Sequence, residues 1–167
     1  CSILLLILIL ILSVPISEYS KKIILDNNQF VKNQIVINPE TKSSKVIDRV
    51  MTIRFNIEID KALKWDFKPL VDIKEIKVGE NNIIKYEGIN LSTKTITATA
   101  DFIMDPIKIT PYLIKTECFC FTKQTLAPGE SQIFVMVFFL DPSLDLDKDL
   151  DKINDLVFTY QLSEYKS

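Results

Sequence analysis

Apolar and polar residues alternate along much of the chain from Val46 onward. In the segment 51–59 the odd positions are Met, Ile, Phe, Ile and Ile, and the even positions 52–58 are Thr, Arg, Asn and Glu. Successive side chains of a strand point to opposite faces, so this segment is predicted to be a half-buried strand. Similar runs predict further strands at residues 71–78, 83–88, 96–102, 115–121, 133–140 and 156–162.

The spacing of turn residues predicts an all-β fold. Gly79–Asn82 and Ala127–Glu130 are turn sequences between strands, and Ile133–Leu140 is nearly continuously apolar, as in a central strand covered on both faces. Pro106 and Pro111 interrupt a stretch that could otherwise be helical, apart from one turn near Pro111. We therefore predict an immunoglobulin-like antiparallel β-sandwich over residues 46–167.

The first residues have a different character. Ile3–Leu12 contains only Ile and Leu and continues to Ile16, whereas a membrane-spanning helix needs about 20 apolar residues. We expect residues 1–16 to be a truncated N-terminal transmembrane anchor and residues 17–45 to be a juxtamembrane linker. A signal-peptide core and the start of a mature lipoprotein at Cys1 are the alternatives. Neither fits as well, because Pro15 disfavours cleavage and no polar tether follows Cys1.

Composition narrows the function classes. The chain has 167 residues, 47% of them hydrophobic, a net charge of −2, three cysteines and no histidine. A net charge of −2 does not favour a nucleic-acid partner. Three cysteines are too few for a disulfide framework. No histidine-containing catalytic set and no glycine-rich phosphate loop can be assembled, so we expect that the protein is not an enzyme.

The most informative chemistry is the run Glu117-Cys118-Phe119-Cys120-Phe121. If the strand continues to Phe121, Cys118 and Cys120 share one face, and the two phenylalanines share the other. Two thiols at this spacing offer soft ligands to Cu(I), Zn or an iron–sulfur cluster. From spacing alone, a pair of buried thiols acting as small hydrophobes is the commoner outcome.

Two further expectations follow from an extended strand. Its i, i+2 Cα separation of roughly 6.5–7 Å makes a disulfide between Cys118 and Cys120 a poor alternative. Lys115 has the parity of the phenylalanines, so its ammonium is predicted to lie away from the sulfurs.

Two other segments are weaker candidates. The acidic run Asp145–Asp151 lacks the glycine and glutamate of a calcium-binding EF-hand loop, so we interpret it as a solvated loop. The aromatic segment Trp65–Pro69 is interpreted as non-periodic. It is interpreted as packing at the edge of the core, with partner binding as the alternative.

Taken together, several motifs resemble the CtaG-type copper-delivery assembly factors of cytochrome c oxidase. The resemblance covers roughly residues 50–142 and the apolar N-terminal run. Its motifs are Arg54-Phe55-Asn56, Leu63-Lys64-Trp65-Asp66-Phe67-Lys68-Pro69, Lys77-Val78-Gly79-Glu80, Asn90, Thr99-Ala100, Tyr112, Lys115-Thr116-Glu117-Cys118-Phe119-Cys120-Phe121, Leu126-Ala127-Pro128-Gly129-Glu130 and Phe138-Phe139-Leu140-Asp141-Pro142.

This resemblance implies a metallochaperone that binds Cu(I) through Cys118 and Cys120 and delivers it to the copper B centre of oxidase subunit I. Phe119 and Phe121 would pack inward, with the sulfurs projecting outward. The implied partners are subunit I, an upstream copper donor, a thiol reductant and a second copy in a homodimer. The implied location is the inner membrane, crossed once, with the β domain in the bacterial periplasm or the mitochondrial intermembrane space.

One departure separates the chain from that family. Its members usually carry another cysteine after a Val-Pro motif at the end of the membrane span, and the segment from Val14-Pro15 to Lys22 has none. A site with three thiolates is therefore not expected within one chain. The alternatives kept open are a structural or interaction factor of the same fold without copper transfer, and a thiol-redox protein that uses the cysteine pair.

Overall fold

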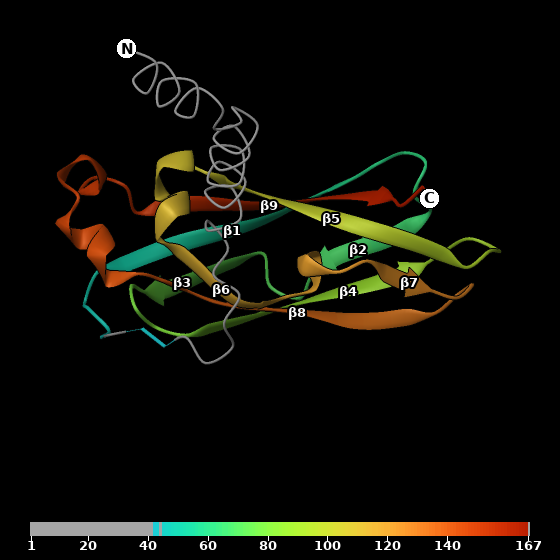
Figure 1. Cartoon of the computed structure of the whole chain (residues 1–167), viewed down its shortest axis with the longest axis horizontal. Helices are drawn as coiled ribbons and strands as arrows, with labels where there is room; N and C mark the ends of the chain where they lie inside the picture. Colours follow the sequence, from blue (N-terminus) through green and yellow to red (C-terminus); the bar gives the residue numbers. More distant parts are fainter. Residues whose placement is uncertain (1–41, 44, 167) are drawn as a thin grey trace, which may run out of the picture. The chain divides into compact units, whose positions relative to one another are not determined.

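The computed structural model describes residues 42–43 and 45–166, which form two β-sheets packed face to face (Figure 1). The predicted anchor, residues 1–16, and all but the last residues of the predicted linker lie outside the described residues. One sheet has the order β3-β1-β9-β5-β7 and the other has the order β2-β4-β8-β6. The strands of the first sheet are β1 (Val50–Ile59), β3 (Ile73–Lys77), β5 (Ile96–Asp105), β7 (Gln124–Leu126) and β9 (Asp155–Glu164). Those of the second are β2 (Trp65–Pro69), β4 (Asn82–Asn90), β6 (Leu113–Cys118) and β8 (Ser131–Leu140).

The core lies between the sheets and is rich in aromatic rings. Phe55 of β1 packs edge-on against Tyr86 of β4, with ring centroids 6.4 Å apart, and Tyr86 packs on Tyr160 of β9 at 5.2 Å. Alternation along β1 follows the prediction, because Met51 and Ile53 are buried between more exposed neighbours. The predicted all-β fold is confirmed.

Three details of the fold differ from the predictions. β1 and β9 pair in parallel, although only antiparallel pairs were expected. Trp65–Pro69 is the strand β2, in which Trp65 and Phe67 point into the core; its alternation is short and ends at a proline. β8 is a central strand, but its burial alternates until Phe138, and only residues 138–140 are buried in succession.

The segment around Asp145–Asp151 contains two short 3-10 helices, η3 (Pro142–Leu146) and η4 (Lys148–Leu150). Asp141 and Asp147 cap them by accepting hydrogen bonds from backbone amides, and Asp145 and Asp149 are exposed. Leu144 and Leu150 hold the segment on the core. This agrees with a solvated acidic loop. A further 3-10 helix, η1 (Ile107–Tyr112), occupies the predicted turn near Pro111.

Within residues 42–43 and 45–166, no helix is both long and apolar enough to cross a bilayer.

Candidate metal centre

The strand β6 ends at Cys118, the first cysteine of the pair, and Phe119–Phe121 form a 3-10 turn, η2. The prediction that the strand continues to Phe121 is therefore wrong. Two contacts hold the turn: the Cys120 amide lies 3.2 Å from Cys118 Sγ, and Gln124 Nε2 donates to the Phe119 carbonyl at 2.9 Å. Because the backbone turns after Cys118, Cys118 lies in a strand and Cys120 lies in a turn, instead of on one face of the same strand.

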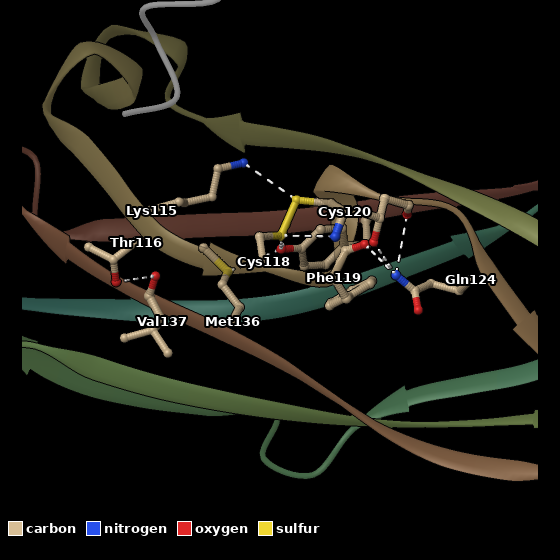
Figure 2. The surroundings of a disulfide bond; sticks show 10 residues. Lys115, Thr116, Cys118, Phe119, Cys120, Gln124, Met136 and Val137 are labelled. Atoms are coloured by element: carbon tan, nitrogen blue, oxygen red, sulfur yellow. Dashed lines mark hydrogen bonds between the residues drawn. A yellow bond between two sulfur atoms is a disulfide. The ribbon is translucent and has the colours of Figure 1, made fainter. Parts of the chain in front are cut away.

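Cys118 and Cys120 are joined by a disulfide (Figure 2). The turn brings their Cα atoms to 5.1 Å, inside the usual disulfide range of about 4.4–6.8 Å. The expectation that a local disulfide is a poor alternative is thus corrected, since it assumed an extended backbone. The structure shows the oxidised form of the pair.

Phe119 anchors the turn in the core, as predicted. Its ring is 8% exposed and packs on Tyr160 at a centroid distance of 4.7 Å and on Phe67 and Phe134 at 5.4 Å. Phe121 is only half-buried. The sulfurs do not both project outward, because Cys118 is 6% exposed and only Cys120 reaches partial exposure.

Lys115 lies beside the disulfide, against the prediction. A bulge shifts the register of β6 against β8 between Lys115 and Glu117, so Lys115 and Cys118 both point inward. The Lys115 ammonium lies 3.9 Å from Cys120 Sγ (Figure 2). It also lies 4.0 Å from the centroid of the Phe102 ring. Burial lowers the pKa of this ammonium to about 8.

A tyrosine hydroxyl is surrounded by three sulfur atoms. Tyr160 Oη lies 2.9 Å from Cys118 Sγ, 3.1 Å from Met136 Sδ and 3.9 Å from Cys120 Sγ. Cys118 and Met136 are also direct cross-strand partners between β6 and β8. Burial raises the pKa of Tyr160 well above its usual value, so the hydroxyl stays protonated and serves as the donor to sulfur.

The sequence interpretation did not include Tyr160 and Met136. Tyr160 falls on the alternating apolar positions of the predicted strand 156–162, which is the signal that was available. Met136 lies in a run that was predicted to be covered on both faces, so alternation gave no signal for it. A buried tyrosine hydroxyl normally has a hydrogen-bond partner, but alternation does not reveal which residue of the opposite sheet provides it.

Comparison with known proteins identifies the family. The family described as cytochrome c oxidase assembly protein CtaG/Cox11 matches residues 21–164. This chain belongs to the CtaG/Cox11 family. A cytochrome c oxidase assembly protein CtaG from Paracoccus denitrificans is 39% identical over 121 residues, which are 72% of this chain and 62% of that protein. Proteins of the same name from Brucella ovis and Ehrlichia ruminantium are 37% and 35% identical, covering 72% and 74% of this chain and 60% and 70% of theirs. The chain thus spans about three fifths of the length of the first two relatives.

Membership of the CtaG/Cox11 family confirms the resemblance drawn from the motifs. In the part of the family domain that the structure describes, no three His, Cys, Asp or Glu side chains are grouped to hold a metal ion. The side-chain atoms at the cysteine turn that could bind a soft metal ion are sulfur atoms. They belong to Cys118, Cys120 and the nearby Met136 thioether. Thiolate and thioether ligands fit Cu(I) and do not suit Mg, Ca or Mn.

The two buried tyrosines of this domain give a matched test of the site. Tyr86 Oη is buried without a hydrogen-bond partner among the described residues, whereas Tyr160 Oη contacts sulfur. Tyr86→Phe is expected to leave the free energy of unfolding unchanged or raise it by about 1–3 kcal/mol, the cost of an unsatisfied buried group. Tyr160→Phe is expected to lower it by about 0.5–1.5 kcal/mol. Urea unfolding of both variants measures the difference, and the opposite order would contradict the assignment of Tyr160 as the sulfur's donor.

Proposed function

We propose that this chain is a membrane-anchored, non-catalytic Cu(I)-binding factor for cytochrome c oxidase assembly. In this proposal it delivers copper to the copper B centre of oxidase subunit I. The observation that carries the proposal is the Cys118–Cys120 pair, adjacent in space at the end of β6 in a domain of the CtaG/Cox11 family.

Copper binding requires the pair to be reduced. A dithiol reductant supplies two electrons and two protons, which break the S–S bond and leave two thiols on the chain. The reductant is itself oxidised to a disulfide. Loss of the thiol protons gives the thiolates that bind Cu(I). A pair of soft ligands with Cys120 partly exposed lets an incoming ligand attack the copper and remove it by exchange. A closed set of four ligands would retain the ion.

The proposed setting is the one that the resemblance of the motifs implies. The described β domain would be the family's immunoglobulin-like domain, held at the inner membrane by residues 1–16 and facing the periplasm or intermembrane space. The proposed partners are subunit I, a copper donor, a thiol reductant and a second copy of the chain. A homodimer would bring a second cysteine pair and could supply the ligand that one chain lacks.

Anaerobic titration of the reduced protein with Cu(I), against a chromophoric competitor, tests the proposal. The parent is expected to bind Cu(I) stoichiometrically, and the double variant Cys118→Ser/Cys120→Ser is expected to lose this binding. Cys1→Ser is the matched control, because it removes the only cysteine outside the pair. If the double variant binds copper as tightly as the parent, the proposal is wrong.

Delivery needs a second experiment. Oxidase activity and copper B content are measured in a strain that lacks its own assembly factor and expresses either the parent or the double variant. Rescue by the parent alone is the expected result. Rescue by both proteins would favour the alternative, a structural or interaction factor without copper transfer.

The observed disulfide favours a second candidate, a thiol–disulfide exchange protein. In that case reduced protein would transfer its two electrons to a disulfide partner, forming the Cys118–Cys120 bond as the partner's bond breaks. Rapid exchange with a dithiol protein, together with no Cu(I) binding by the reduced chain, would support this candidate over copper delivery.

A further inference from the structure

Lys115 is the only charged residue among the buried residues of the described chain, with 2% of its surface exposed. The salt bridges of the described residues are made by Arg49, Lys68, Lys77 and Lys148, so Lys115 has no carboxylate partner there. A buried ammonium without an anion lowers the stability of a fold. A negative charge close to the Lys115 ammonium would offset this cost.

The contacts of the ammonium indicate where that charge would be. Cys120 Sγ lies 3.9 Å from Lys115 Nζ, and the rings of Phe102 and Phe121 lie 4.0 Å and 5.8 Å from it. The rings attract a cation only weakly, and the disulfide sulfur carries no net charge. Reduction and copper binding would place thiolate charge directly beside the ammonium.

We propose that Lys115 is the counter-ion of the copper-loaded cysteine pair and selects a monovalent ion. This inference rests on the proposed function. Two thiolates with one Cu(I) carry one net negative charge, which the ammonium cancels. Two thiolates with a divalent ion such as Zn(II) carry no net charge, and the ammonium would then remain unpaired in the core. Lys115 is a positioning residue that acts on the metal through the charge of the thiolates.

The experiment compares Cu(I) and Zn(II) affinities of the reduced protein, using the metal ions with chromophoric competitors. Lys115→Leu removes the charge and adds no atom that could bind the metal, and its Cu(I) affinity is expected to fall about 10- to 100-fold. Its Zn(II) affinity is expected to stay equal or to rise. Lys115→Arg keeps the charge and is expected to retain the preference of the parent for Cu(I) over Zn(II).

Lys123→Leu is the matched control. Lys123 is exposed and lies near the same turn in sequence, with its ammonium 3.4 Å from the centroid of the Tyr165 ring and no sulfur contact among the described residues. Neither metal affinity is expected to change in this variant.

Three outcomes would overturn the inference. The first is a Cu(I) affinity of Lys115→Leu equal to that of the parent. The second is a fall of both metal affinities by the same factor, which would indicate a general structural role. The third is loss of folding in both Lys115→Leu and Lys115→Gln, because removal of an uncompensated buried charge is expected to raise the thermal midpoint of the oxidised form. If the cysteine double variant still binds Cu(I), the proposed function fails as well; if only these outcomes occur, it stands.

Discussion

Oxidised protein is expected to bind no Cu(I) at the Cys118–Cys120 pair, and reduction is expected to restore stoichiometric binding. Copper binds thiolates, and the disulfide uses both sulfurs in one covalent bond. The turn is held by contacts that do not involve the S–S bond, namely the buried Phe119 ring and the Gln124 amide. We therefore expect the two sulfurs to stay close together after reduction, ready to bind the ion.

The measurement uses two samples of the same protein. In the oxidised sample, the loss of two hydrogens by mass spectrometry confirms the disulfide. In the other, a phosphine reduces the pair and is then removed anaerobically. Bound copper is measured after gel filtration, with Cys1→Ser as the background so that no third thiol contributes. Equal copper in the oxidised and reduced samples would contradict the assignment of the pair as the copper site.

Phe119→Ala is expected to cause the largest loss of stability among substitutions at the cysteine turn. The ring is buried and packs on four aromatic neighbours from both sheets, so its removal leaves a cavity at the centre of the core. Truncation of a buried Phe typically lowers the free energy of unfolding by about 3–5 kcal/mol. Since the ring also fixes the turn between the cysteines, Cu(I) affinity is expected to fall in the same variant.

Phe121→Ala is the control, because Phe121 belongs to the same turn but is only half-buried. Urea unfolding of the reduced proteins gives both free energies, and the smaller loss is expected for Phe121→Ala. A loss at Phe119 equal to or smaller than that at Phe121 would show that the turn is not anchored through Phe119.

Alternation predicted most strands correctly because both sheets bury one face and expose the other. The same reasoning failed at the cysteines for a specific reason. The bulge between Lys115 and Glu117 changes which residues point inward, and it depends on pairing with β8, which the local sequence does not specify. Cys118 was consequently assigned to the outward face, away from Lys115, although both are buried. The strand was also extended beyond Cys118 into the residues that form the turn η2.

The site also depends on contacts that are distant in sequence. Tyr160 is 42 residues from Cys118, and it belongs to the opposite sheet. Alternation predicts that Tyr160 points inward, and motif resemblance identifies the cysteines as metal ligands. Neither predicts that this hydroxyl lies against Cys118, because that contact follows from how the two sheets are placed on each other.

The position of β9 has a consequence for the order of events during synthesis. β9 is the last strand of the described residues, yet it lies between β1 and β5 in its sheet. While a ribosome is still adding residues 155–164, β1 and β5 have no strand to join them, and Cys118 has no hydroxyl against it. A nascent chain that contains both cysteines but not yet β9 therefore lacks the contact of Tyr160 with Cys118. The contacts around Cys118 can therefore form only after residues 155–164 have been synthesised.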